Sequence, residues 1–441
     1  MSDGDRFQPW GTPGNGNPAA AVPASAFRSG GPFLPFGAGR SYGDSCTVTG
    51  GKLLDGRYGA AIRSVDHEHG VITADAGVTL SALIEAAAPG GMLPVVPGTQ
   101  FATLGGAIAN DVHGKNHHRR GSFGAWVNEI TLRRSDQQQP LTLRKGDPLF
   151  AATIGGMGMT GRIERAKVRL TKVPGQRVRE RAVRLKNLDD YFARAEDADR
   201  DHEYAVAWVD SLATGAKLGR GHLIVGDHVP GGESGTSRRG ALLRVPFTPP
   251  VSLLNGISLR AFNEFYLRSV SRGGRDRVVP HDGFFFPLDR VLEWNRLYGP
   301  RGLHQHQSVL PWEAAREGVR TLLELAQAHG HASFLTVIKT FGENHSPAIM
   351  SFARPGVTLT LDFPARGAAT LRLLDELDSV VMDAGGAVNP YKDRRMSAET
   401  FARSFPRWRD VEVMRDPAIR SDFWRRTALA LSHDHAWEDA A

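Results

Sequence analysis

The sequence of 441 residues contains a single cysteine, Cys46. One thiol forms neither an internal disulfide nor a multi-cysteine metal site. A chain of this length buries enough apolar surface to fold without such cross-links. We therefore interpret Cys46 as a small apolar side chain of the interior, not as a reactive thiol.

Long hydrophobic runs are also missing. No apolar stretch approaches the roughly 18–20 residues that cross a bilayer as a helix. The first 27 residues lack the basic start and apolar core of a secretory signal. We expect a cytoplasmic protein without a signal peptide or transmembrane segment, whose membrane contact is peripheral, at the inner membrane.

Acidic residues are outnumbered by basic ones. The sequence has 54 Lys and Arg against 47 Asp and Glu, a formal net charge of +7 at pH 7. This excess favours anionic partners such as phosphorylated ligands, nucleic acid or an acidic membrane surface. The basic runs 162–172 and 177–184 carry no nucleic-acid recognition motif. A nucleic-acid-binding module is thus a minor alternative, and we predict no nucleic-acid partner.

Composition changes along the chain divide it into parts. Residues 1–31 form an arm rich in Gly, Pro and Ala, which we expect to be flexible. Short β-branched runs alternate with glycine clusters over 32–177, and longer strands and helices follow over 178–385. The tail 386–441 is rich in Arg and Trp. This mixture predicts an α+β or α/β fold.

Hydrophobic periodicity predicts individual elements in both large parts. The expected strands are 71–75, 205–209, 333–338 and 357–363. The expected helices are 80–88, capped by Thr79, then 314–329 and 368–384.

Glycine gathers in four clusters, at 36–44, 97–99, 103–118 and 155–161. Glycine lets consecutive N–H groups point into one concavity and lets the backbone approach a ligand closely. Several such loops around one diphosphate would suit a dinucleotide, although the same glycines could simply form turns. The pair Gly37 and Gly39 lacks the strand–GxGxxG–helix context of an NAD site.

Three histidines at 113, 117 and 118 raise the question of a metal. No HExxH pattern is present, and no carboxylate stands at a helical offset that would complete a site. Gly114 and Asn116 oppose a regular helix here. We predict no metal.

Motifs along nearly the whole chain resemble one flavoenzyme family. The segments are GRSYGD (39–44), VPGT (96–99), GGAIA (105–109), HGKNHH (113–118), GSFG (121–124), KLGR (217–220), EWNRLYGP (293–300), LDFP (361–364), YKD (391–393) and AETF (398–401). In order and spacing they resemble the vanillyl-alcohol oxidase superfamily, and within it the decaprenylphosphoryl-β-D-ribose 2′-oxidase family.

This resemblance implies a two-domain α+β fold with FAD as the cofactor. An FAD-binding domain of the p-cresol methylhydroxylase type would span 32–177 and be completed by 386–441. A substrate-binding domain with an antiparallel sheet would span 178–385. The implied cofactor-binding residues are Gly37, Ala38, Gly39, Arg40, Ser41, Tyr42, Gly43, Pro97, Gly98, Thr99, Thr103, Gly105, Gly106, Ala109, Asn110, His113, Asn116, His117, Gly158, Gly161, Ile163 and Tyr391.

The implied reaction oxidises the C2 hydroxyl of a polyprenylphosphoryl-β-D-ribose to a 2-keto sugar. It is the first half of an epimerisation to polyprenylphosphoryl-arabinose, a cell-envelope glycan precursor, completed by a separate NADH-dependent short-chain keto-reductase. Lys392 and His113 would be catalytic. The implied substrate-binding residues are Lys115, Phe285, Gln305, Gln307, Lys339, Thr360, Asp362 and Lys392.

Other interpretations of these residues stay open. Lys392 could be an exposed lysine in a turn, His113 could bind only loop backbone, and the remaining positions could be ordinary sheet surface. A soluble aldonolactone or alditol oxidase with FAD would share the same cofactor loops, and it is our alternative function.

Several residues depart from the family pattern. Arg40 stands where related sugar oxidases carry a histidine bonded covalently to the flavin, so we predict dissociable FAD. Thr360 replaces a cysteine of the mycobacterial form. Phe285 and Phe286 replace a Tyr-His pair, and His304 and His306 alternate with the two glutamines. These departures leave the exact sugar and lipid tail open.

Overall fold

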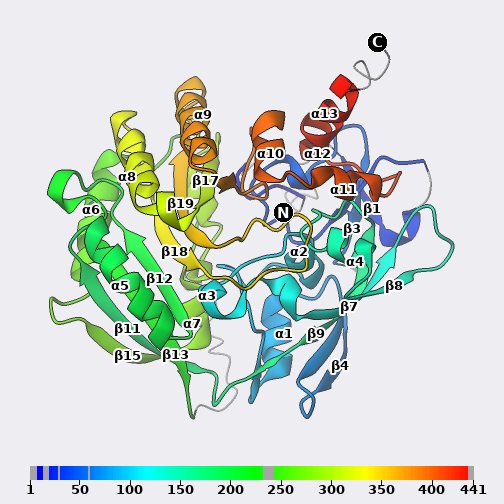
Figure 1. The fold of residues 1–441 in the computed structure, drawn as a ribbon, viewed down its shortest axis with the longest axis horizontal. Helices are drawn as coiled ribbons and strands as arrows, with labels where there is room; N and C mark the ends of the chain where they lie inside the picture. The colour runs from blue at the N-terminus through cyan, green and yellow to red at the C-terminus, as the bar shows by residue number, and fades with distance from the viewer. Residues whose placement is uncertain (1–6, 13–18, 28–29, 58–59, 232–242, 436–441) are drawn as a thin grey trace.

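The computed structural model describes residues 7–12, 19–27, 30–57, 60–231 and 243–435. Helices and mainly antiparallel sheets share the chain, which confirms the predicted α+β class. In Figure 1 an eight-stranded sheet occupies one side of the molecule and a five-stranded sheet the other. None of the helices in the described residues is long and apolar enough to cross a membrane.

The five-stranded sheet is antiparallel, in the order β4-β5-β9-β7-β8. Its strands are β4 (Ile62–Asp66), β5 (Val71–Asp75), β9 (Arg162–Arg169), β7 (Val127–Arg133) and β8 (Leu141–Arg144). The short helices α1 (Leu80–Ala87), α2 (Leu104–Ala109), α3 (His117–Arg120) and α4 (Pro148–Thr153) lie in its connections, with a small pair of β6 (Gly91–Met92) and β10 (Thr171–Lys172). Thr79 caps α1 by accepting a hydrogen bond from the Ala82 N–H, as predicted.

The eight-stranded sheet has the order β15-β11-β13-β12-β18-β19-β17-β20 and is antiparallel throughout. Its strands are β15 (Arg275–Pro280), β11 (Arg177–Leu185), β13 (Gly221–Val229), β12 (Tyr204–Val209), β18 (Val337–Phe341), β19 (Gly356–Pro364), β17 (Leu303–Leu310) and β20 (Ala387–Val388). The long helices α5 (Leu188–Asp201), α8 (Trp312–Ala328) and α9 (Ala368–Asp383) cover one face of it (Figure 1). A parallel pair, β14 (Leu243–Arg244) and β16 (Val291–Leu292), and the helices α6 (Gly256–Arg268) and α7 (His281–Phe285) lie in the connection from β13 to β17.

The predicted elements agree with the observed ones except at one strand start. We expected a strand over 333–338, but β18 begins at Val337. The Ser333 hydroxyl accepts a hydrogen bond from the Asp362 N–H and donates to the Leu335 carbonyl oxygen. These side-chain bonds take the place of ladder bonds, so this part is a connection.

The N-terminal segment and the C-terminal helices both attach to the glycine-rich loop 36–44. A three-stranded parallel sheet joins β1 (Ala20–Pro23), β3 (Lys52–Asp55) and β2 (Phe33–Phe36). The Gly11 N–H donates to the Tyr42 carbonyl oxygen at 3.1 Å. A Cβ on Gly11 would lie 2.3 Å from that same oxygen, so the close approach requires glycine. These contacts tie the described part of the expected arm to the loop.

The chain ends in the helices α10 (Ala398–Ser404), α11 (Trp408–Val413), α12 (Asp422–Arg426) and α13 (Ala428–His435). Arg426 links them to the first part of the chain. Its guanidinium lies 2.6 Å from an Asp44 carboxylate oxygen and 2.8 Å from one of Asp393. Asp44 ends the loop 39–44, and Asp393 follows Lys392. One arginine therefore holds two segments of the site together.

We expect Arg426→Met to destabilise the fold. The change leaves the Asp44 carboxylate without its cation and Asp393 with only the longer contact to Arg395 at 3.8 Å, and breaking a buried pair costs about 3–5 kcal/mol, of which we expect the lower end because Arg426 is partly exposed. The matched control is Arg425→Ala, which removes an exposed pair with Asp422 and should cost under about 0.5 kcal/mol. Urea unfolding followed by tryptophan fluorescence measures both, and equal midpoints for the two variants would contradict this role.

Candidate active site

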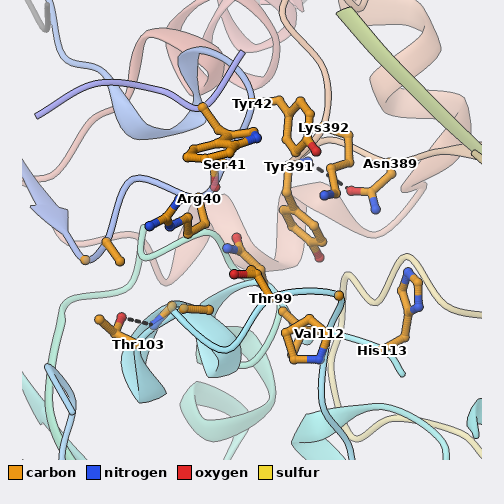
Figure 2. Close-up of a pocket in the computed structure, with 18 of the residues that line it drawn as sticks. Arg40, Ser41, Tyr42, Thr99, Thr103, Val112, His113, Asn389, Tyr391 and Lys392 are labelled. Carbon is orange, nitrogen blue, oxygen red and sulfur yellow. Dashed lines mark hydrogen bonds between the residues drawn. The ribbon is translucent and has the colours of Figure 1, made fainter. Parts of the chain in front are cut away.

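A cavity of about 450 Å³ lies between the glycine-rich loops and the eight-stranded sheet. The close-up in Figure 2 shows Arg40, Tyr42, His113, Tyr391 and Lys392 around it, from three separate segments of the chain. The strands β12, β13, β17, β18 and β19 supply its other wall. The cavity thus brings together segments that lie more than 350 residues apart in the sequence.

All four glycine clusters reach this cavity. The predicted cofactor residues that line it are Gly37, Ala38, Gly39, Arg40, Ser41, Tyr42, Pro97, Gly98, Thr99, Thr103, Gly105, Gly106, Ala109, Asn110, His113, Gly158, Gly161, Ile163 and Tyr391. The predicted substrate residues that line it are Lys115, Phe285, Gln305, Gln307, Lys339, Thr360 and Lys392.

The loop 38–41 forms a nest of donors. Within the described part of the chain, the backbone N–H groups of Ala38, Gly39, Arg40 and Ser41 donate to no protein acceptor. Gly39 has φ +63°, a left-handed conformation that turns successive N–H groups toward one side. Consecutive free amides of this kind bind phosphate oxygens. The loop therefore fits one end of a diphosphate.

The side chain of Arg40 lies flat among aromatic rings. Its guanidinium carbon is 4.5 Å from the ring centroid of Trp10 and 5.1 Å from that of Phe101. Burial lowers the pKa of Arg40, and the nearby Asp289 carboxylate opposes that shift. Its Nε has no hydrogen-bond partner among the described residues. The hydroxyl of Tyr391 is buried and without a partner in the same set. Both atoms are available to a polar ligand.

The register of the sheet decides which residues of β17 face the cavity. Gln305 lies opposite Asp362, and Gln307 lies opposite Thr360. Directly opposed residues of antiparallel strands share a face, so these four side chains belong to one side. His306 lies on the other side, where its Nε2 is 3.2 Å from Asp378 of α9. His306, between the two glutamines, and His304, two residues before it on the same strand, therefore do not line the cavity.

One chain of hydrogen bonds runs along the wall of the cavity from Tyr391 to Lys339. The Tyr391 N–H donates to Asn389 Oδ1 at 3.0 Å, and Asn389 Nδ2 donates to Gln307 Oε1 at 2.8 Å (the first bond is dashed in Figure 2). Gln307 Nε2 lies 2.9 Å from His113 Nε2, and Lys339 Nζ lies 3.3 Å from His113 Nδ1.

The direction of this chain follows from its first donor. A backbone N–H can only donate, so it fixes the Asn389 amide, which in turn fixes the Gln307 amide. Gln307 then presents its NH₂ to His113 Nε2, which must accept. The proton of a neutral His113 ring is therefore on Nδ1, facing Lys339. Nδ1–H can donate only to an uncharged Lys339 amine, so the geometry favours the neutral form of both groups.

Three half-buried lysines that line the cavity reinforce that electrostatic state. Burial lowers the pKa of Lys339 to about 7, and repulsion from Lys115 and Lys392 contributes. Burial likewise lowers the pKa of Lys115 to about 8. The pKa of His113 falls well below its ordinary range because of burial and the nearby Lys339. The cavity is therefore poorly suited to further positive charge and well suited to an anionic ligand.

Lys392 is held over an aromatic ring. Its Nζ lies 4.2 Å from the ring centroid of Tyr42. Burial lowers the pKa of Lys392, and the buried Asp362 carboxylate opposes that shift. Burial also raises the pKa of Asp362, which accepts a hydrogen bond from Gln305 Nε2. Lys392 is thus an interior residue, not the exposed turn lysine of the alternative interpretation.

Four predicted site residues do not line the cavity. Gly43 packs behind the loop, where a Cβ would lie 1.9 Å from the Asp393 carbonyl oxygen. Asn116 donates to the Pro94 carbonyl oxygen at 2.9 Å, and the His117 ring packs on Phe341 with centroids 4.5 Å apart. The Asp362 carboxylate accepts the hydrogen bond that orients Gln305. These residues support the cavity instead of facing it.

Other lining residues were missed by sequence reasoning. They are Trp10, Asn389, Asp289, Trp208 and Tyr266, among others. Asn389 stands two residues before Tyr391, and its place next to the YKD motif was a signal that could have been used. Trp208 and Tyr266 belong to β12 and α6, and no local pattern marks them, since only the tertiary fold brings them to the cavity.

Comparisons with known proteins agree with this geometry. Residues 12–136 match the FAD binding domain family. The chain is 36% identical to decaprenylphosphoryl-β-D-ribose oxidase of Mycolicibacterium smegmatis over 426 residues, which cover 93% of this chain and 92% of that protein. It is 34% identical over 371 residues to a Streptomyces coelicolor protein called "Uncharacterized protein in mprA 5'region", covering 80% of this chain and all of that one.

These matches confirm the family predicted from the sequence motifs, with FAD as its cofactor. The free amides of loop 38–41 and the unpartnered Arg40 and Tyr391 atoms fit such a cofactor. Because the similarity to the mycobacterial oxidase extends over nearly the whole chain, this protein belongs to the decaprenylphosphoryl-β-D-ribose oxidase family and is an FAD-dependent oxidoreductase.

Proposed function

We propose that the protein oxidises the C2 hydroxyl of a polyprenylphosphoryl-β-D-ribose to the 2-keto sugar. The M. smegmatis relative is named for decaprenylphosphoryl-ribose, which supports a lipid-linked pentose. The observation that carries the proposal is the hydrogen-bond chain from Tyr391 to Lys339. It joins the segment beside the glycine loops to a proton acceptor on the sheet wall, within one cavity.

FAD would be held by the glycine-rich loops in this proposal. The amides of 38–41 would bind the diphosphate, and the loops 97–99, 103–110 and 158–163 would surround the rest of the nucleotide. Residues 32–177 with 386–441 would form the FAD-binding domain, and 178–385 the substrate-binding domain. The link through Arg426 supports this division, because it joins the C-terminal helices to the loop 39–44.

Oxidation of a secondary alcohol to a ketone removes two electrons and two protons. FAD, when bound, accepts the two electrons together with one of the protons. The chain must hold the carbinol carbon and take the second proton from the hydroxyl. We assign that proton to Lys339, whose pKa is lowered to about 7, so that a large share of its amine is neutral at pH 7, and which lies beside His113. In the resting site the single lone pair of this amine accepts from His113 Nδ1–H, so that hydrogen bond must break and the lone pair must turn to the substrate hydroxyl when the proton is taken.

Lys392 and the two glutamines would bind the sugar. The Lys392 ammonium, fixed over Tyr42, would stabilise negative charge that develops in the cavity and contact a substrate oxygen. Gln305 is fixed by Asp362, and Gln307 by Asn389, so both amides are rigid. Lys115, whose Nζ donates to the Phe284 carbonyl oxygen, would help anchor a phosphate group.

The keto product requires a second enzyme. Epimerisation needs reduction of the new carbonyl from the opposite face, and we assign this step to a separate NADH-dependent short-chain keto-reductase. The positive net charge supports peripheral contact with an anionic membrane that holds the lipid-linked sugar.

The first prediction of this proposal concerns the bond between protein and cofactor. Arg40 offers no imidazole for a covalent link to the flavin, so FAD is expected to dissociate when the protein unfolds. After acid precipitation and centrifugation, the yellow absorbance should be in the supernatant and the pellet should be colourless. A yellow pellet would show a covalent bond and contradict this expectation.

The second prediction concerns Lys392. Mixed anaerobically with a short-chain prenyl-phosphoribose, the purified protein should lose its flavin absorbance near 450 nm, about the usual wavelength of oxidised flavin. Lys392→Ala should keep most of the bound FAD but slow this bleaching by about 10²–10³-fold, because a group that stabilises developing charge is lost. The control is Lys172→Ala, an exposed lysine far from the cavity.

Two outcomes would change the interpretation. Equal bleaching rates for Lys392→Ala and the unaltered protein would remove Lys392 from the reaction. Rapid bleaching by free pentitols or aldonolactones, with none by the prenyl-phosphoribose, would favour the soluble sugar oxidase.

The third prediction follows from the proton acceptor. Only the neutral Lys339 amine can accept a proton, so the bleaching rate should rise with pH around a midpoint near 7, where the pKa of Lys339 lies. Lys339→Met should be about 10²–10⁴-fold slower and should lose this pH dependence. Stopped-flow measurements of the bleaching rate between about pH 6 and pH 9 test both expectations, because this interval covers the titration of the Lys339 amine.

Gln307→Glu tests the direction of the chain. A carboxylate accepts where the amide donated, so His113 would carry its proton on Nε2, and Nδ1 would accept from a protonated Lys339. The midpoint should therefore move to higher pH. Thr358→Val is the matched control, since it removes the second acceptor of the Gln307 amide, at 3.2 Å, without reversing any bond. An unshifted midpoint in Gln307→Glu would refute the assigned direction.

A further inference from the structure

Exposed apolar side chains gather in one segment of the molecule. Among the described residues, twelve large hydrophobic side chains are exposed, and seven of them fall between positions 243 and 265. They are Leu243, Phe247, Val251, Leu253, Ile257, Phe262 and Phe265, and we call them the α6 surface. Scattered apolar residues are ordinary on a protein surface, but such a concentration marks an interaction site.

The helix α6 cannot turn this surface inward. Asn255 caps it by accepting from the N–H groups of Ile257 and Ser258 at 3.0 and 3.1 Å. On the inner face, Leu259 is buried and Asn263 donates to Asp210 Oδ1 at 2.6 Å. Ile257 and Phe265 therefore stay on the outer face, 84% and 74% exposed.

The α6 surface is continuous with the cavity through aromatic rings. Phe262, which is 37% exposed, stacks parallel to Tyr266 with centroids 5.9 Å apart. Tyr266 meets the Trp208 ring edge-on at 4.7 Å, and both of these residues line the cavity. An apolar path thus leads from the molecular surface to the site.

Basic residues accompany the apolar ones. Between 243 and 272 the chain has four arginines, Arg244, Arg260, Arg268 and Arg272, all exposed. Glu264 is the one acidic residue there, and it pairs with Arg268 at 2.9 Å and Arg220 at 3.2 Å. A water-facing helix with apolar and arginine side chains together is typical of segments that lie in the interface of an anionic bilayer.

We propose that the α6 surface docks the protein on an anionic lipid bilayer. Ile257 and Phe265 enter the boundary between headgroups and acyl chains, and the arginines contact lipid phosphates. Phe262, Tyr266 and Trp208 then guide the apolar tail of the substrate between bilayer and cavity. This inference rests on the proposed lipid-linked substrate. The excess of arginine and the continuity with the cavity favour a membrane over a protein partner.

Sedimentation with vesicles tests the docking. The FAD-loaded protein should bind vesicles of phosphatidylcholine and phosphatidylglycerol in equal parts, and it should bind pure phosphatidylcholine at least about tenfold more weakly. The double variant Ile257→Ser, Phe265→Ser should lose about tenfold or more in affinity for the anionic vesicles. Val413→Ser is the matched control, because Val413 is 86% exposed on the distant α11.

Charge-reversal variants distinguish a local contribution of the α6 arginines to membrane binding from an effect of the net charge of the protein. Arg260→Glu should weaken binding to anionic vesicles by about fivefold to tenfold, since each surface cation contributes about that much. Arg372→Glu, an exposed arginine of α9, changes the net charge equally and should have little effect. Equal losses for the two variants would mean that net charge alone drives binding, which would overturn the proposal.

Oxidation of a water-soluble, short-chain prenyl-phosphoribose tests the proposed function without requiring the protein to bind a membrane. The double variant should oxidise it like the unaltered enzyme, but should fail with long-chain substrate embedded in vesicles. Failure of the unaltered enzyme with the short substrate would refute the proposed function and leave the vesicle result standing. Equal vesicle binding by the double variant and Val413→Ser would overturn the docking surface. So would a dimer in ultracentrifugation that the double variant converts to monomer, since a second copy would then be the occupant.

Discussion

The site depends on one backbone N–H whose direction cannot change. Tyr391 can only donate to Asn389, and this fixes two side-chain amides and one imidazole in succession until Lys339 is reached. Without the first donor, each amide could turn over and the imidazole could carry its proton on either nitrogen. The chain therefore converts a fixed feature of the backbone into a defined protonation state at its fourth side chain, Lys339, which is the proton acceptor in the proposed reaction.

The same constraint explains how the fold tolerates three half-buried lysines in one cavity. Ammonium groups in a poorly hydrated cavity repel one another, and part of that cost is avoided when one of them is neutral. His113 supplies a donor that suits the neutral Lys339 amine, while Asp362 stands near Lys392 and stabilises its charged form. In the proposed reaction, Lys339 would thereby act as a base and Lys392 as a cation. Two residues of the same type obtain different chemistry from their neighbours.

Prediction from the sequence was most accurate for features that depend on residues close together in the chain. Glycine clusters, helix caps and the periodicity of α8 and α9 depend on neighbouring residues, and these features were found where the sequence placed them. The strand expected at 333–338 began late because the Ser333 hydroxyl bonds Asp362, which is 29 residues away. Asn116, His117 and Asp362 matched family motifs, yet none of them lines the cavity. Motif position identifies a neighbourhood, whereas sheet register decides which side chain faces the ligand.

Residues joined only by tertiary structure could not be predicted in this way. Asn389 acts through Gln307, which is 82 positions earlier, and Tyr266 meets Trp208 across the sheet.

The outer face of α6 was missed for a related reason. A helix with apolar residues on both sides looks in sequence like a buried one, and only the bond from Asn263 to Asp210 shows which side is inward. That bond leaves Ile257 and Phe265 in water, and exposing them carries a free-energy cost in the absence of a partner. The cost is removed if the protein works at a bilayer, which is also where a lipid-linked sugar resides. Under the proposed function, the polar contact that orients α6 and the polar chain that orients Lys339 would serve one arrangement, in which the apolar tail and the reactive hydroxyl of the substrate would occupy opposite ends of the same cavity.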